Sequence, residues 1–317
     1  MPDRRGISLA VALPIMKLIV QPRDGWSEFL SAIRQAKREI DLVIFRFDRP
    51  DVAKALDVAI KRGVVVRTLV AHTNRGGEKN LRKLEQRLLE TGAIVSRTGD
   101  EFVRYHGKLM VVDRSVLWLM CFNLTALDVG RSRSFAVVSR QRAEVQQALK
   151  LFEADATRQP FEPAPSQLVV SPENARSILA DYIRKAKKQL LIYDPKVADG
   201  AFLKTLKDHV KSGVDVRIIG RVSKGGSDVP HEKYPGKRLH ARVIVRDHHD
   251  AFLGSQSLRK LELDKRREVG IIVRDQAVVA ELARTFEEDW TLTDSGKREA
   301  KRREKGKSEE ERLQETA

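Results

Sequence analysis

Residues 106–113 read HGKLMVVD and residues 240–247 read HARVIVRD. Each octet carries a His, a basic residue two positions later and an Asp five positions after that. The apolar run inside each octet is typical of a buried strand, so the His and the basic residue are expected on one face of a strand. The repeated octet therefore predicts a chain built from two related halves.

The repeat extends outward from the octets through most of the chain. KLIVQPRDGWSEFLSAIRQAKREI, starting at Lys17, aligns with QLVVSPENARSILADYIRKAKKQL, starting at Gln167, at an offset of 150. Both copies space their apolar residues for a helix. Further on, RGVVVR (62–67) aligns with SGVDVR (212–217), where a Gly ends a helix and a strand begins. The octets lie only 134 apart, because the first half carries an extra amphipathic segment at 78–92.

These patterns predict an α/β fold of two homologous halves, each a mixed β-sheet flanked by helices, related by a pseudo-twofold axis with the active site between them. The expected parts are an N-terminal extension, half one, a Pro-rich linker, half two and a charged tail, at residues 1–15, 16–158, 159–166, 167–292 and 293–317. The tail is expected to be disordered or a solvated helix. Met16, where the repeat starts, is an alternative first residue.

The chain has 317 residues, 41% of them hydrophobic, so it can bury a substantial core. Its net charge is +16, and the final 22 residues contribute little, with eight Lys/Arg against six Asp/Glu. So basic a body favours an anionic partner, such as nucleic acid, an acidic lipid surface or a phosphorylated small molecule. The charge by itself does not choose among these partners.

Cysteine content and hydropathy predict a cytoplasmic protein without a membrane span. Cys121 is the only cysteine, which excludes an intrachain disulfide and a cysteine-based zinc site. The short apolar run near the N-terminus is interrupted by Pro14 and lacks a clear cleavage site for a signal peptide. No stretch reaches the roughly 18 apolar residues of a spanning helix.

If the halves meet at the pseudo-twofold axis, His106, Lys108, His240 and Arg242 line one cleft. This set suits a phosphodiester. Two cations can bind the phosphate oxygens, one neutral His can attack phosphorus and form a phosphohistidine, and the other His can protonate the leaving oxygen. No cofactor or metal is required. His106 is the favoured nucleophile, because its half keeps the Lys.

HGKLMVVD fits the HxKxxxxD signature of the phospholipase D superfamily, and HARVIVRD resembles it with Arg in place of Lys. The resemblance covers roughly residues 17–290 and includes that family's duplicated architecture. It implies that Asp113 and Asp247 belong to the catalytic set by supporting the active-site geometry. It also implies a phosphate-holding segment after each motif, with Asn123, Ser255, Ser257 and Glu268 as the substrate-binding residues.

The resemblance leaves the substrate open, because the family includes phospholipases, phosphatidyl transferases and nucleases. Cardiolipin synthases usually bring membrane segments, and an Asp in both motifs argues against the tyrosyl-DNA phosphodiesterase and polyphosphate kinase branches. The expected function is therefore a phosphodiesterase that hydrolyses or transfers a diester of a phospholipid or a nucleic acid, with possible peripheral contact to an anionic membrane. The alternatives are a dedicated nuclease and a catalytically degenerate phosphate-binding protein. The second is kept open by Arg242, by Ser257 in place of Asn and by the missing Gly-Ser of half one.

Several other candidates have simpler interpretations. His248-His249-Asp250 is expected to form a solvated turn rather than a metal site, and His209 is expected to pack in a helix face. Arg75-Gly76-Gly77 and Lys224-Gly225-Gly226 are either phosphate-binding loops or ordinary turns. The tryptophans, Trp26, Trp118 and Trp290, are expected in the core or at an interface.

Overall fold

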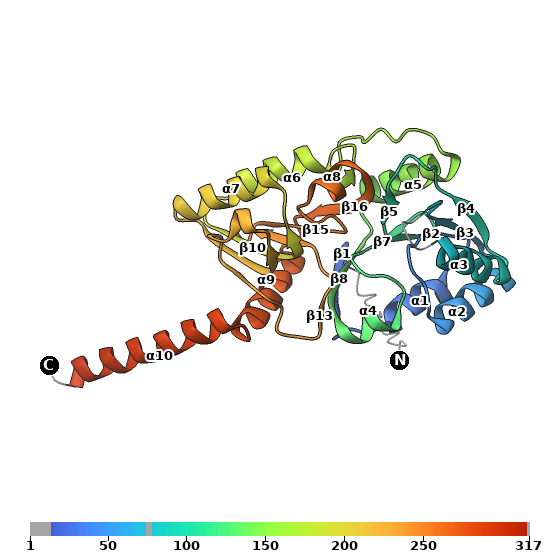
Figure 1. Cartoon of the computed structure of the whole chain (residues 1–317). Helices are drawn as coiled ribbons and strands as arrows, with labels where there is room; N and C mark the ends of the chain where they lie inside the picture. Colours follow the sequence, from blue (N-terminus) through green and yellow to red (C-terminus); the bar gives the residue numbers. More distant parts are fainter. Residues whose placement is uncertain (1–13, 74–77, 316–317) are drawn as a thin grey trace, which may run out of the picture.

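The computed structural model describes residues 14–73 and 78–315. Two α/β halves lie side by side, and a long C-terminal helix, α10, projects away from them (Figure 1). The predicted fold class is confirmed, since each half contains a mixed sheet flanked by helices. The octets and their flanking repeats were sufficient to predict this architecture, because both hydrophobic periods are local properties of the sequence.

Within the described residues, half one begins with a strand and contains eight strands and five helices. They are β1 (Met16–Gln21), α1 (Ser27–Gln35), β2 (Glu39–Val43), α2 (Pro50–Lys61), β3 (Val65–Val70), α3 (Glu78–Glu90), β4 (Ile94–Arg97), β5 (Arg104–Tyr105), β6 (Leu109–Val112), β7 (Val116–Met120), α4 (Ala126–Arg131), β8 (Ser132–Ser139) and α5 (Arg142–Thr157). The extra segment at 78–92 is indeed a helix, α3, whose leucines Leu81, Leu84 and Leu88 are buried.

Half two repeats this order without a counterpart of α3. Its elements are β9 (Leu168–Ser171), α6 (Ala175–Arg184), β10 (Gln189–Val197), α7 (Gly200–Lys211), β11 (Asp215–Val222), the 3-10 turn η1 (Lys224–Gly226), β12 (His231–Glu232), β13 (Arg238–Leu239), β14 (Val243–Arg246), β15 (Asp250–Gly254), α8 (Lys260–Asp264), β16 (Arg266–Val273) and α9 (Gln276–Thr291). Residues 159–166, between the halves, form no helix or strand.

Each half contributes one long sheet. The first has the order β1-β8-β7-β6-β2-β3-β4, and the second has the order β12-β11-β10-β14-β15-β16 followed by β5. Within each sheet a parallel pair, β2 with β3 or β10 with β11, adjoins an antiparallel hairpin that begins with the octet strand. The mixed character predicted for both sheets follows from this arrangement.

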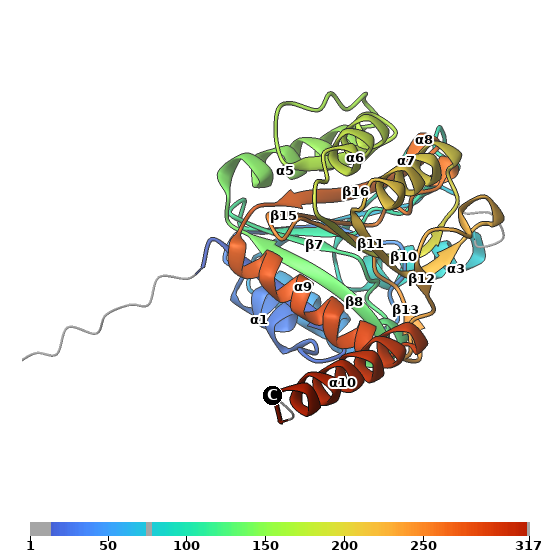
Figure 2. The same cartoon turned by 90° about the vertical axis from the view of Figure 1, so that its left-hand side faces the viewer.

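Three hydrophobic clusters show how the layers pack. One cluster joins the inner faces of both sheets to α5 and α9, which lie between the halves. The other two clusters are separate, one beneath α1, α2 and α3 and the other beneath α6 and α7. Figure 2 shows α9 running across β8, so a helix of half two covers a strand of half one. The halves therefore share one continuous core.

The halves also exchange strands. β5, from half one, pairs with β16 in parallel, and β13, from half two, pairs with β8 in parallel. The chain crosses between the sheets just before each octet strand, so His106 and His240 lie in the crossings rather than on the strands where the sequence places them. Their backbone amides donate instead to strands of the opposite half, at Arg267 O (2.8 Å) and Arg133 O (3.0 Å).

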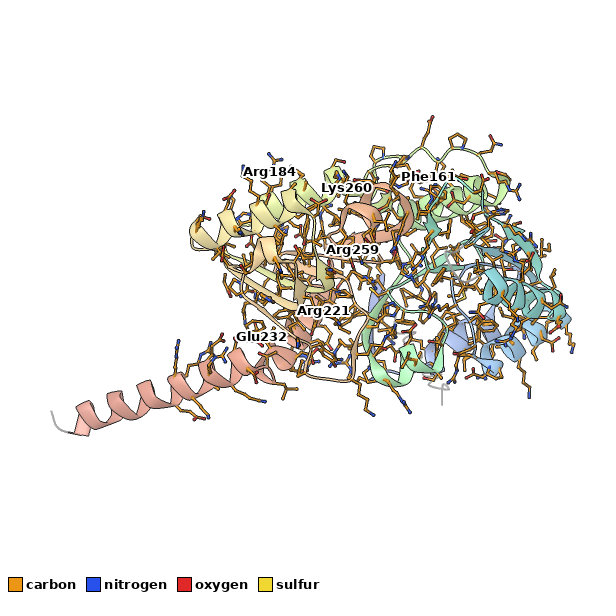
Figure 3. All side chains as sticks on the ribbon, in the orientation of Figure 1. Phe161, Arg184, Arg221, Glu232, Arg259 and Lys260 are labelled. Atoms are coloured by element: carbon orange, nitrogen blue, oxygen red, sulfur yellow. The ribbon has the colours of Figure 1, made fainter. Side chains whose placement is uncertain are left out.

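The C-terminal segment forms a long helix. α10 spans Asp294–Glu315, and its first turn is fixed to half two. The hydroxyl of Ser295 donates to Glu232, and the indole of Trp290 donates to Glu299 at 3.2 Å. Figure 3 labels Glu232 beside the start of this helix. These contacts attach the first turn of α10 to β12 and α9.

The remaining candidates resolve as follows. His248 has a positive φ of 54° in the turn after β14, and Nε2 of His209 donates to the carbonyl of Ile183 at 2.9 Å within the helix packing. Lys224-Gly225-Gly226 forms the turn η1, with Gly226 buried against Leu203, whereas Arg75-Gly76-Gly77 lies outside the described residues. All three tryptophans are buried.

Candidate active site

His106 is held by a carboxylate from the other half. Its Nδ1 lies 2.8 Å from Oε2 of Glu268, which is fully buried on β16. This bond fixes the ring and, with Nδ1 carrying the proton, leaves Nε2 as an unprotonated nitrogen. Burial and the charges of Lys108, Arg242 and His240 lower the pKa of His106 well below its ordinary value. These positive charges oppose protonation of the His106 imidazole.

His240 has the reciprocal arrangement. Its Nδ1 lies 2.8 Å from Oδ1 of Asp128, a buried residue of α4 in half one. Burial opposes ionisation of Asp128, but hydrogen bonds from His240 and Asn123 and the charge of Arg238 outweigh it and hold the Asp128 pKa well below its usual range. Burial lowers the pKa of His240 itself to about 4, although the bond to Asp128 opposes this shift.

The sequence analysis named Glu268 as a substrate-binding residue rather than as the partner of His106, and it missed Asp128. At the octet offset of 134, Glu268 corresponds to Ser134, which has no carboxylate. The Ser134 hydroxyl donates to the carbonyl of His240 at 2.6 Å, and Asp128 reaches the imidazole from a different element. One signal could have found it, because Asp128 is the only acidic residue between Asn123 and Ser134.

The two cations of the octets are also gathered here. Lys108 is 1% exposed, and its ammonium donates to the carbonyl of His106 at 2.7 Å. Nε of Arg242 donates to the Ser257 hydroxyl at 3.2 Å, while its Nη1 is buried without a hydrogen-bond partner. An unpartnered guanidinium nitrogen inside a polar site is positioned for an anionic ligand.

Burial lowers the pKa of Lys108 to about 7, helped by the charge of Arg242. The folded protein thus binds this proton less tightly than the unfolded chain, and the resulting loss of stability is complete below pH 7 and vanishes above the ordinary Lys pKa of about 10.4. We expect Lys108→Met to raise the free energy of unfolding by about 1–3 kcal/mol at pH 7, with a gain that shrinks toward pH 10.

Urea unfolding at several pH values measures this gain, with the exposed Lys204→Met as the matched control. The same variant should lose turnover, because Lys108 is expected to bind the phosphate. Equal gains in both variants, or a Lys108→Met gain that does not change with pH, would show that the ammonium is not strained by burial.

The residues expected to hold phosphate make different contacts. Glu268 bonds the His106 imidazole and Asn123 donates to Asp128, the partner of His240, and each retains a buried oxygen without a hydrogen-bond partner, Oε1 and Oδ1. Ser257 orients Arg242. Ser255 instead exchanges hydrogen bonds with the backbone of Val269, so the structure gives it a role in joining β15 to β16.

The comparisons with known proteins bear on this site. A family model described as "Cardiolipin synthase, PLD-like domain" matches residues 29–156 and 179–290, which contain both octets. The chain belongs to this phospholipase-D-like family. Its members are enzymes of the phosphodiesterase type, so the resemblance read from the two octets is confirmed at the level of the family.

Individual relatives of this phospholipase-D-like chain are distant. Cardiolipin synthase 1 of Bacillus anthracis is 24% identical over 340 residues, covering 86% of this chain and 66% of that protein. The polyphosphate kinase of Porphyromonas gingivalis (TM-score 0.70, 18% identity, 86% of this chain and 50% of that one) and the phosphatidylserine synthase of Haemophilus influenzae (0.65, 11%, 85% of each) share its fold.

The cardiolipin synthase branch, disfavoured from the sequence for want of membrane segments, is thus the branch that the family model and curated relatives name. In residues 14–73 and 78–315, none of the helices has the length and apolar content needed to cross a bilayer.

The structure does not bring Asp113 and Asp247 to the imidazoles of this phospholipase-D-like site. Each follows its octet strand, about 20 Å along an extended chain from its His. The Asp113 carboxylate accepts from the backbone amides of residues 37–39, and Asp247 accepts from those of 187–189. We therefore place both aspartates in the fold, where they anchor the start of β2 and β10, and not among the reacting groups.

A cavity of about 480 Å³ opens beside the site, on the side of half one. Asn123 and Asp128 belong to its lining, which connects it to the imidazole pair. Basic side chains outnumber acidic ones in the lining, which also includes Asp48, polar residues and apolar residues, and the basic ones are Arg46, Lys83, Arg87, Arg104 and Arg238. Among the described residues, no group of three or more His, Cys, Asp or Glu side chains converges as a metal site.

Proposed function

We propose that the protein cleaves or transfers a phosphodiester through a covalent phosphohistidine, with a phospholipid as the first candidate substrate. The observation that supports this most is the reciprocal support of the imidazoles, in which Nδ1 of each bonds a carboxylate of the opposite half. Both Nε2 atoms are thereby left for proton or phosphoryl transfer. The phospholipid is favoured because the curated relatives are named cardiolipin synthases.

In the first step, Nε2 of His106 attacks phosphorus, and an N–P bond forms as the P–O bond to the leaving alcohol breaks. His240, protonated at Nε2, transfers that proton to the leaving oxygen. In the second step, neutral His240 takes a proton from water or an acceptor alcohol, whose oxygen attacks phosphorus and breaks the N–P bond. Water gives hydrolysis and an alcohol gives transfer.

The charges around the pair suit this sequence. Without substrate, both imidazoles have lowered pKa values, so both are neutral near pH 7. A bound phosphate offsets the charges of Lys108 and Arg242, which are among the causes of that lowering, and so favours the protonated His240 that the first step requires. The same two cations stabilise the charge on the equatorial oxygens.

A nuclease remains the second candidate. The net charge of +16 and the basic lining of the cavity suit a nucleic-acid backbone, which binds more weakly as salt increases. Contact with an anionic membrane surface is a proposal that the same charge supports.

The mechanism uses no metal, so we expect chelation to leave activity intact. The wild type should turn over bis-p-nitrophenyl phosphate at the same rate with and without EDTA. Phosphatidylcholine vesicles and plasmid DNA, each with EDTA, then identify the substrate class. Loss of turnover with EDTA would contradict the mechanism, and binding of DNA or anionic vesicles without any turnover would show a degenerate phosphate-binding protein.

A further inference from the structure

Three guanidinium groups gather beside His106. The ring of Phe45 packs edge-on against the imidazole, with centroids 5.1 Å apart. Arg46 and Arg104 lie over this ring, at 5.7 and 5.4 Å from its centroid. Arg266 lies beside Arg104, because β5 pairs with β16. We call Arg46, Arg104 and Arg266 the arginine cluster.

This cluster is unfavourable in the empty protein. Arg104 and Arg266 face each other directly in the β5–β16 pair, and like charges in that relation are destabilising. Arg266 is compensated by Glu262 at 2.8 Å, whereas Arg104 has no carboxylate partner among the residues that the structure describes. Burial, followed by the charge of Arg266, lowers the pKa of Arg104. An anion bound between these groups would remove the repulsion.

The other half shows what a compensated version looks like. Arg238 corresponds to Arg104 at the octet offset of 134 and occupies the equivalent position on the exchanged strand β13. It faces Ser132 rather than an arginine, donates to that hydroxyl at 3.0 Å, and forms an ion pair with Asp128. The duplication therefore leaves one of two equivalent arginines unpaired.

The cavity lies on the same side. Arg46 and Arg104 belong to its lining, together with Lys83 and Arg87 of α3, the helix that half two lacks. Asn123 connects this basic wall to the imidazole pair. A ligand bound at the imidazoles can thus extend toward half one and meet four cationic side chains.

We propose that the arginine cluster and the basic wall of the cavity form a subsite for a second phosphate of the substrate, one short linker away from the reacting phosphodiester. This inference rests on the proposed function and specifies on which side the substrate extends. A lipid headgroup is the favoured source of that phosphate. The cavity is also lined by Leu127, which is 49% exposed, whereas Phe45 and Phe47 are buried and offer no free ring for stacking bases.

The test uses two chromogenic substrates, p-nitrophenyl glyceryl phosphate with and without a phosphate on the distal glycerol hydroxyl. We expect the wild type to prefer the doubly phosphorylated diester by roughly 10- to 100-fold in kcat/KM, the range for a charged hydrogen-bonded pair. Arg104→Gln should abolish that preference while changing kcat/KM for the singly phosphorylated diester less than about twofold. Arg46→Gln should reduce the preference without disturbing the β5–β16 pair.

Arg184→Gln is the matched control. Arg184 is exposed on α6, near the upper edge of the molecule in Figure 3, and its partner is a surface carboxylate, Asp181. The Arg184→Gln protein should prefer the doubly phosphorylated diester as strongly as the wild type does. Equal losses on both substrates in Arg104→Gln and Arg46→Gln, or a wild type without preference, would overturn the subsite.

A binding measurement separates failure of the subsite from failure of the proposed function. If neither diester is turned over, calorimetry with glycerol 1,3-bisphosphate and glycerol 1-phosphate still tests the subsite, since Arg104→Gln should weaken only the former, by about tenfold. Unchanged binding of the bisphosphate would overturn it. The lipid source would be overturned if a short single-stranded oligonucleotide competed with the bisphosphate in the wild type but not in Arg104→Gln, and phosphatidylglycerol vesicles did not compete.

Discussion

Replacing His106 with alanine is expected to lower the turnover of bis-p-nitrophenyl phosphate by at least about 10⁴-fold, as loss of a nucleophile does in other covalent mechanisms. The reason is that no other described imidazole occupies the position between Glu268 and Lys108. Rapid quenching at alkaline pH followed by mass spectrometry should find one phosphoryl group on His106 in the wild type. His240→Ala should lower turnover by about 10²- to 10⁴-fold, as loss of a general acid does.

His231→Ala is the matched control, because this imidazole is exposed on β12 and bonds a nearby carbonyl, Val229 O, at 2.8 Å. It should retain full turnover. A phosphoryl group found on His240 would reverse the two roles, and wild-type turnover in His106→Ala would end the covalent mechanism altogether.

Asp128→Asn is expected to lower kcat by about 10³-fold and to change KM little, as removal of an imidazole-orienting carboxylate does elsewhere. The amide nitrogen of Asn would donate to Nδ1 of His240, which stabilises the tautomer with its proton on Nε2. The variant also lacks the negative charge that stabilises an imidazolium. The pH profile should change along with kcat, because the apparent pKa of His240 falls when its anionic partner is removed.

Moving the carboxylate provides the sharper test. Ser134 occupies the position in half one that Glu268 occupies in half two, and its hydroxyl already lies against the backbone of His240. Ser134→Glu added to Asp128→Asn should recover at least about tenfold of the lost kcat, because outer-shell partners of His typically contribute 10–100-fold. Thermal unfolding checks that both variants fold. A folded Asp128→Asn protein with unchanged kcat and pH profile would show that Asp128 does not position His240.

Much of the fold could be predicted because its determinants are local. Apolar residues at helical spacing, glycines after helices and β-branched runs recur at a constant offset, and they reveal the duplication without any knowledge of packing. The two-residue strands β5 and β13 could not be predicted, since so short a segment has no period and its partner lies in the other half. The crossing of the chain at each His follows only from that pairing.

The site residues also divide into those that the sequence identifies and those that it does not. His106, Lys108, His240, Arg242 and Glu268 are identifiable because their spacing is repeated or belongs to a known motif. Asp128 was not predicted because a carboxylate can reach an imidazole from different positions in the chain. Asp128 lies on the short helix α4, whereas Glu268 lies on the strand β16. Asp113 and Asp247 show the reverse case, in which membership of a motif does not place a residue beside the reaction.

The strand exchange makes the two halves mutually dependent in more than their packing. A half by itself would lack the strand that the other half adds to β8 or β16. Its histidine would also lack the carboxylate that bonds Nδ1. Unfolding of one half therefore removes its own imidazole from the site and also the carboxylate that orients the imidazole of the other half. Activity therefore requires that both halves are folded. Substitutions in either half are restricted by the contacts that it makes with the other half.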